Sequence, residues 1–161
     1  MPDINVLIYA HREDAPEHER YAAWLRRLAS GPEPFALSSW ILSGFLRIVT
    51  NPRIFDPATP TDTAIAFCRR LRNRPHAVSV APGPRHWRIL VDLIERADVR
   101  GALVSDAHLA ALAIEQGCEL VTTDGDFGRF PDLRWRHPLA PRPSGFGGPA
   151  DSSARPRDED R

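Results

Sequence analysis

Lysine is absent from this chain, and all 21 basic residues are arginine. They are balanced by 21 acidic residues, so the formal net charge is zero. A neutral chain argues against a protein that binds nucleic acid only through non-specific electrostatic attraction. Arginine pairs well with phosphate, so the bias fits a nucleic-acid partner. Codon bias in a GC-rich genome explains it equally simply, and we favour that interpretation.

Cysteine and long apolar stretches are also scarce. Cys68 and Cys118 are too few for a disulfide framework and have no neighbours at zinc-ligand spacing, so we expect thiols of a reduced compartment. No apolar run reaches the roughly 18 residues of a membrane span, and no signal-peptide pattern is present. We therefore predict a cytoplasmic protein with no membrane role.

The 161 residues suit one domain with a single core. Apolar periodicity predicts helices that alternate with short apolar strands, which indicates an α/β fold with a parallel sheet covered on both sides. The expected helices are 17–30, 40–50, one from 61, 85–97 and 106–116 (capped by Ser105), and the expected strands are 35–37, 78–80, 120–122 and 133–136. We divide the chain into a folded domain, 1–140, and a disordered tail rich in Pro, Gly, Ser and charge, 141–161.

Two carboxylates follow the predicted strand 120–122 directly. Asp124 and Asp126 stand in the turn T-T-D-G-D. In open α/β sheets, ligands bind beyond the carboxyl ends of the strands, so these acids are expected to face a crevice. An ordinary Asx-rich turn between two elements is the alternative.

Further acids stand where other elements begin. Asp3 and Asn5 open the segment 3–10, which is either a strand or a buried helical turn, and Asp106 opens the helix 106–116. Each has a simpler role: Asp3 as an N-cap, and Asp106 in compensating the helix dipole, worth about 0.3–1 kcal/mol. Taken as an ordered set, however, such carboxylates indicate a Mg²⁺ site for phosphate chemistry.

Four segments together resemble, in order and spacing, the PIN-domain toxins of VapC type over about residues 3–139. They are D-I-N-V-L-I-Y-A, S-S-W-I-L-S-G-F-L-R-I-V-T-N-P-R-I-F, S-D-A-H-L-A-A-L-A and L-V-T-T-D-G-D-F-G-R-F. The resemblance implies a PIN-like three-layer α/β/α fold with a central parallel sheet. It also implies a Mg²⁺-dependent endoribonuclease (Mn²⁺ as a substitute) that is the toxin of a toxin–antitoxin pair, commonly a homodimer, held by a VapB-type antitoxin.

The resemblance also assigns roles to individual residues. Asp3 and Asp106 match the principal Mg²⁺ ligands, and Asp124 matches the acid that completes the site. Asp126 matches an auxiliary acidic position that is a further metal ligand. Matching polar positions nearby are Asn5, Thr122 or Thr123 (we favour Thr123) and Arg47, whose expected role is a salt bridge to a carboxylate rather than contact with phosphate.

The chain departs from the family pattern in two places. Gly44 stands where the family usually has Glu, which favours a one-metal mechanism or replacement of that ligand by Asp126, and leaves impaired catalysis as another outcome. Only Met1 and Pro2 precede Asp3, whereas the family normally has a central strand there. We therefore expect that strand to be absent or stunted, or the encoded start to lie upstream.

Two other functions compete with the nuclease. One is a degenerate PIN domain that binds RNA or an antitoxin without cleavage, which Gly44 and the short N-terminus favour. The other is a small-molecule phosphatase that uses Asp124-Gly125-Asp126 as a D-x-D motif, although its supporting loops are missing. Metal binding and RNA cleavage separate these classes.

Overall fold

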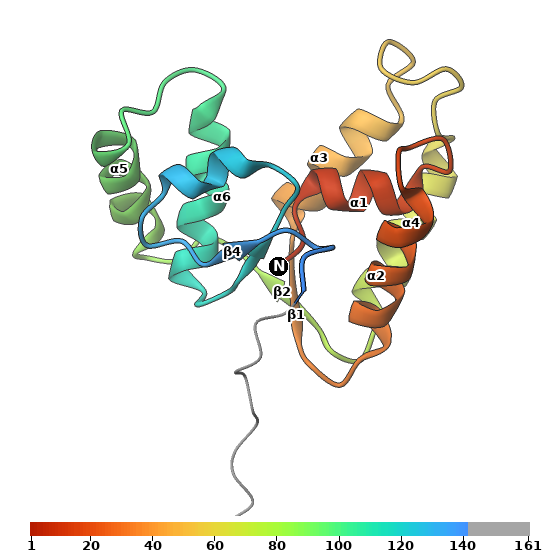
Figure 1. Cartoon of the computed structure of the whole chain (residues 1–161), viewed down its shortest axis with the longest axis horizontal. Helices are drawn as coiled ribbons and strands as arrows, with labels where there is room; N and C mark the ends of the chain where they lie inside the picture. Colours follow the sequence, from red (N-terminus) through yellow and green to blue (C-terminus); the bar gives the residue numbers. More distant parts are fainter. Residues whose placement is uncertain (142–161) are drawn as a thin grey trace, which may run out of the picture.

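The computed structural model describes residues 1–141, and it contains helices and short strands in alternation (Figure 1). The predicted tail, 141–161, lies outside the described residues except for Pro141. The elements are α1 (Ile4–His11), α2 (His18–Ser30), β1 (Phe35–Ser38), α3 (Ser39–Val49), α4 (Thr61–Arg72), β2 (Ala77–Val80), α5 (His86–Arg96), α6 (Leu103–Glu115), β3 (Leu120–Val121), the 3₁₀ helix η1 (Gly125–Arg129) and β4 (Trp135–Arg136).

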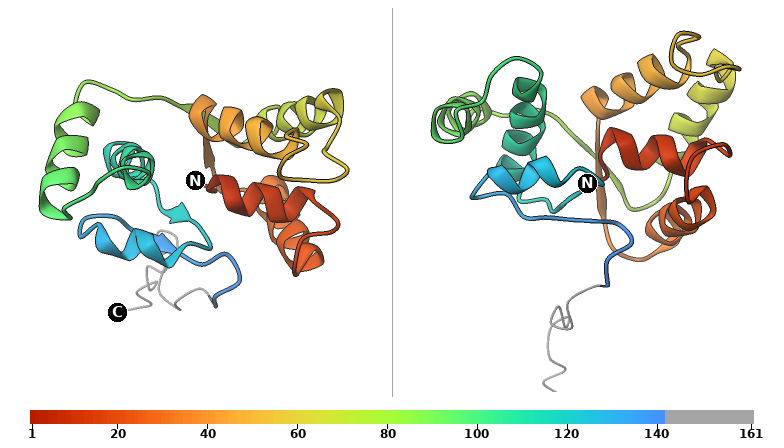
Figure 2. Two further views of the ribbon diagram at one scale, coloured as in Figure 1. Left: turned by 90° about the horizontal axis from the view of Figure 1, so that it is seen from above. Right: turned by 45° about the horizontal axis from the view of Figure 1, so that its top comes forward.

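All strand pairs are parallel, as predicted, but they form two separate pairs. β1 pairs with β2, and β3 pairs with β4. Figures 1 and 2 show α5 and α6 on one side of the strands and α1–α4 on the other. The three-layer α/β/α fold with parallel strands is therefore confirmed, although the central sheet is divided into halves rather than continuous.

The N-terminal segment lies beside β3 in an extended conformation but forms no full strand within the described residues. Pro2 forms a single parallel bridge with Val121. The amide of Val121 donates to the carbonyl of Met1 over 2.8 Å, and the amide of Asp3 donates to the carbonyl of Val121 over 2.8 Å. The expectation of a stunted first strand is confirmed.

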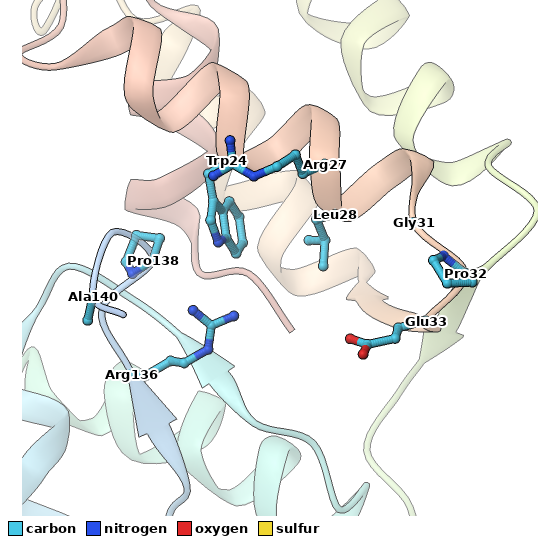
Figure 3. Close-up of a pocket in the computed structure, with 9 residues that line it drawn as sticks. All are labelled: Trp24, Arg27, Leu28, Gly31, Pro32, Glu33, Arg136, Pro138 and Ala140. Carbon is cyan, nitrogen blue, oxygen red and sulfur yellow. The ribbon is translucent and has the colours of Figure 1, made fainter. Parts of the chain in front are cut away.

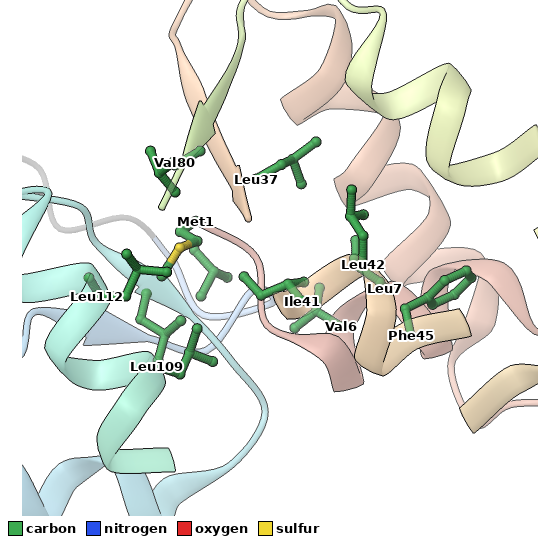
Figure 4. Packing of buried hydrophobic residues seen from close by; sticks show 14 of the residues in the cluster. Met1, Val6, Leu7, Leu37, Ile41, Leu42, Phe45, Val80, Leu109 and Leu112 are labelled. Atoms are coloured by element: carbon green, nitrogen blue, oxygen red, sulfur yellow. The ribbon is translucent and has the colours of Figure 1, made fainter. Parts of the chain in front are cut away.

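The segment after this bridge is a helix. Asp3 is its N-cap, because its side chain accepts the amide of Ile4 over 2.6 Å. Val6 and Leu7 of α1 are fully buried against α3, where Ile41 and Phe45 are also fully buried. Figure 4 shows that Met1 lies between this group and the side chains that α6 contributes from the other side.

The helix boundaries predicted from periodicity agree with the structure within one or two residues, with one exception. The predicted cap Ser105 is wrong, because α6 begins at Leu103 and Ser105 lies inside its first turn. Asp106 remains in that turn. None of the helices within residues 1–141 has the length and apolar character needed to span a bilayer.

Candidate active site

Asp3 and Asp124 end neighbouring extended segments and therefore lie at one edge. Asp3 follows the bridge to Val121, and Asp124 follows β3 as the N-cap of η1, where its side chain accepts the amide of Asp126 over 2.8 Å. The predicted Asx-type turn is thus present. Because parallel strands end on the same side, it also brings Asp124 to the edge that carries Asp3.

A threonine hydroxyl connects these two acids. The Thr122 hydroxyl is fully buried and donates to Oδ2 of Asp3 over 2.7 Å. It accepts from the amide of Asp124 over 3.0 Å and from Nδ2 of Asn5 over 3.2 Å. One donated and two accepted bonds use the full hydrogen-bonding capacity of a hydroxyl. Thr122 therefore fixes Asp3, Asn5 and Asp124 relative to one another.

Thr123, which we favoured for this role, does not have it. Within the described residues its hydroxyl forms no hydrogen bond, and its amide lies 3.5 Å from Oδ1 of Asn5. The signal that distinguishes the two threonines is burial: a threonine inside a buried strand needs hydrogen-bond partners, and those available are polar groups at the strand end.

Asp106 reaches the same edge from α6. The pKa of its carboxyl group is raised, first by burial and then by the negative charges of Asp124, Asp3 and Asp126. The pKa of Asp3 is likewise raised, chiefly by burial and further by Asp124, although the bonds from Thr122 and Ile4 oppose the shift. The sequence-predicted acids therefore influence one another electrostatically, as members of one site do.

Asp126 and Arg47 are less closely engaged. The Asp126 side chain is 61% exposed and forms an ion pair with Arg129 over 3.1 Å. Arg47 is exposed on α3, and its guanidinium forms no ion pair or hydrogen bond within residues 1–141. The salt bridge expected for Arg47 is therefore not formed in this part of the chain, which leaves its guanidinium open to contact with phosphate.

The charges of this edge fit a hard divalent cation. Within residues 1–141, neither Asp3 nor Asp106 forms an ion pair, and the Asp106 carboxylate accepts no hydrogen bond. Buried carboxylates without a basic partner are costly unless a cation neutralises them. No group of three or more His, Cys, Asp or Glu side chains in the described residues converges closely enough to hold a metal ion. One or two carboxylates completed by water and phosphate oxygens, the usual Mg²⁺ arrangement, agree with this geometry.

Gly44 lies against the residue that follows Asp3. A Cβ atom at position 44 would stand 2.4 Å from Cδ1 of Ile4 and 3.2 Å from its Cγ1. The Ile4 side chain thus occupies the space that any side chain at position 44 would need. A larger residue at position 44 would therefore require the Ile4 side chain to shift.

A separate cavity of about 420 Å³ lies at a distance from this chemistry in the fold (Figure 3). Its lining comes from the end of α2, the loop before β1 and the segment from β4 to Ala140. Trp24 and Arg136 face each other there, with the guanidinium 6.0 Å from the ring centroid. None of the four acids lines this cavity, so cavity size does not identify the candidate site.

Comparison with known proteins identifies a family. Residues 1–133 match the PIN domain family. The chain is 44% identical over 137 residues to the ribonuclease VapC43 of Mycobacterium tuberculosis. This match covers 85% of this chain and 93% of the relative. It is 40% identical over 136 residues to the ribonuclease VapC25 of the same organism, which covers 84% of this chain and 96% of the relative.

Solved structures share the fold at lower identity. VapBC2 from Rickettsia felis, bound to a DNA fragment from its promoter, matches with a TM-score of 0.61 and 20% identity over 85% of this chain and 96% of that one. FitAcB from Neisseria gonorrhoeae matches with a TM-score of 0.58 and 18% identity over 85% of this chain and 96% of that one.

Proposed function

The chain belongs to the PIN-domain family of VapC toxin ribonucleases, and we propose that it hydrolyses RNA phosphodiester bonds with Asp3, Asp106 and Asp124 as its catalytic acids. The observation that supports this assignment is that buried Asp3 and half-buried Asp106 and Asp124 act on one another electrostatically at one edge. The pKa of Asp106, raised by burial and by the three other acids, reflects that interaction.

In the proposed mechanism the chain supplies a set of carboxylates that its own hydrogen bonds orient. Asp3 is held by two donors, the Thr122 hydroxyl and the Ile4 amide, so its carboxylate is oriented before substrate arrives. Asp124 acts electrostatically on both Asp3 and Asp106, and Asp126 adds negative charge that acts on Asp106. A divalent ion bound here supplies activation of the attacking water and neutralisation of the phosphate, and we expect the departing oxygen to become a 3′-hydroxyl.

The proposal includes the ion and the partners. Activity requires a divalent metal, and we propose Mg²⁺, with Mn²⁺ as a substitute, because the donors are oxygens. We propose a VapB-type antitoxin as the inhibitory partner, supported by the fold shared with VapBC2. A homodimer that acts on cytoplasmic RNA completes the proposal, and sedimentation of the purified protein tests the oligomeric state.

RNA cleavage in the presence of metal tests the proposed function. We expect purified protein to cleave RNA with Mg²⁺ or Mn²⁺ and to lose this activity in EDTA. Asp106→Asn and Asp124→Asn should each lower the rate by about 100-fold or more, because a metal ligand contributes several kcal/mol of transition-state stabilisation.

Asp98→Asn is the matched control, since Asp98 is 80% exposed and pairs only with Arg100 in the described part of the chain. It should leave cleavage unchanged. Full activity in both site variants would refute the assignment. RNA binding without metal binding and without cleavage would instead identify a degenerate PIN domain.

A further inference from the structure

Trp40 is an exposed aromatic side chain that is held by a ladder of rings. Its side chain is 46% exposed at the start of α3. Its ring centroid lies 4.5 Å from that of His108 on α6, with an angle of 37° between the planes. His108 in turn lies 4.5 Å from the ring of His86. One face of the indole is thus supported by protein, and the rest remains open to solvent.

The far end of this ladder is anchored in the protein interior. His86 is buried, and its Nε2 lies 3.1 Å from the carbonyl oxygen of His108, to which the ring donates in the matching tautomer. A fixed support reduces the conformational entropy that Trp40 would lose when something packs on it. The indole is therefore preorganised.

Trp40 also stands at the edge of the strands to which we assign the candidate site. It follows Ser38, the last residue of β1, and so stands at the carboxyl edge of the parallel strands, where Asp3 and Asp124 lie. One helical turn further along the same face of α3, Gly44 contacts Ile4, the neighbour of Asp3.

We propose that the exposed face of Trp40 is a stacking platform for an unpaired nucleobase of the RNA that the acids cleave, an inference that rests on the proposed function. Single-stranded RNA is recognised largely by stacking of splayed bases on aromatic side chains. Arg47, seven residues along the same helix face and without an ionic partner in residues 1–141, contacts phosphate of the same strand.

Binding measured without metal isolates this role from catalysis. The probe is a fluorescein-labelled oligoadenylate in EDTA, followed by fluorescence anisotropy. Trp40→Ala should weaken binding about 5- to 150-fold, as expected for the loss of one stacked base, whereas Trp40→Phe retains a ring and should remain near wild type. Trp87→Ala is the matched control, because Trp87 is 73% exposed and no ring of the described residues packs on it.

An abasic strand of the same length provides the decisive comparison. Wild type and Trp40→Ala should bind it equally, a result that general unfolding or loss of charge would not produce. Unchanged oligoadenylate binding by Trp40→Ala would overturn the proposed platform and would assign Trp40 to a protein-binding surface. A loss of binding in Trp87→Ala as large as in Trp40→Ala would overturn it as well. Absence of metal-dependent cleavage in wild type would refute the proposed function while the binding comparison still decides the platform.

Discussion

Asp106 has several acidic neighbours at the candidate site. Three other carboxylates raise its pKa in addition to burial, and only Arg129 lowers it. Such an arrangement opposes folding in the absence of a cation, because the charged form is less stable in the folded protein than in water. If the site binds a metal ion as proposed, this loss of stability is the cost of the metal affinity.

The pH dependence of stability follows from the sign of this shift. An acid whose pKa is higher in the folded state binds more protons there, so the free energy of unfolding falls as the pH rises above the ordinary value of 3.8 and through the folded-state pKa. In EDTA, we expect Asp106→Asn to melt at a higher temperature than wild type at neutral pH. The difference should vanish below the ordinary carboxyl pKa.

Added Mg²⁺ should reverse the order of the two melting temperatures. Ligand that binds only the folded state stabilises it by mass action, so wild type gains and Asp106→Asn does not. Thermal melts of both proteins across pH, with and without Mg²⁺, provide the measurement. Asp132→Asn, an exposed acid paired with Arg96, serves as the control. A variant that melts below wild type in EDTA would contradict the expected sign.

At this scale, residue types were easier to predict from sequence than contacts. The acids at strand and helix ends could be selected because turn chemistry and element order are local properties. The choice between Thr122 and Thr123 could not be made, because it depends on which threonine points into the core beside a segment 119 positions away. The same holds for Arg47, whose expected salt bridge needed a long-range partner.

Among the elements, α1 and α3 approach each other closely where Ile4 meets Gly44. In an ordinary exposed helix, Gly→Ala stabilises by about 1 kcal/mol. Here the added Cβ would lie 2.4 Å from Cδ1 of Ile4, so the isoleucine has to change rotamer. Overpacking of this kind costs up to about 1–3 kcal/mol, and the gain in helix propensity of about 1 kcal/mol offsets part of that cost.

A double-mutant cycle tests this contact. Gly44→Ala alone should lower the free energy of unfolding by up to about 2 kcal/mol. In the Ile4→Val background, which lacks the Cδ1 methyl, the same substitution should be neutral or stabilising by up to about 1 kcal/mol. Denaturant unfolding of the four proteins gives the coupling energy. Equal effects of Gly44→Ala in both backgrounds would show that Ile4 does not restrict the site.

Helices with a clear apolar stripe, such as α2 and α5, were predictable because periodicity is a local signal. The start of α6 was not, since Ser105 has the chemistry of a cap but α6 begins at Leu103, with Ala102 as an N-cap that forms no side-chain hydrogen bond. Segment 3–10 remained open between helix and strand for a related reason. Its apolar residues are consecutive, so the apolar pattern does not distinguish the repeat of a helix from the repeat of a strand.

Over the whole molecule, the parallel sheet is interrupted at its centre. In the described part of the chain, the β1–β2 pair and the β3–β4 pair are not hydrogen-bonded to each other. The N-terminal segment forms its β-bridge with Val121 of β3. A cavity of about 410 Å³ lies beside Met1, with Phe35 and Ala36 of β1 on one wall and Val121 on another. The Met1 ammonium is largely buried and donates to the carbonyl of Glu119 over 2.7 Å. Burial lowers the pKa of that group.

An apolar extension before Met1 should therefore stabilise the protein. A short β-branched segment can run between β1 and β3, replace the buried ammonium by an amide and fill the cavity. Each well-buried side chain is expected to contribute about 1.5–3 kcal/mol, an upper range for complete burial. A Gly-Ser extension of equal length is the control, because it removes the charge without adding apolar surface. Equal melting temperatures for the two extensions would exclude a missing strand as the cause of the cavity.

The overall class of fold was predictable from alternation of elements, whereas the division of the sheet was not. Strand pairing joins residues far apart in sequence, and β3 and β4 are each only two residues long. Such short strands give almost no periodic signal. Parallel order was nevertheless expected, because helices separate most of the successive strands.

The Thr122 hydroxyl has a consequence for how such a protein can be recombined. It joins the first turn of the chain to the segment that follows β3, so the two ends of the domain are interdependent although 119 positions separate Asp3 from Thr122. A chimera that takes its N-terminal segment from one relative and its β3–η1 segment from another would break that shared support. The two segments therefore form one unit. They must be exchanged together if a chimera is to keep the arrangement of Asp3, Asn5 and Asp124.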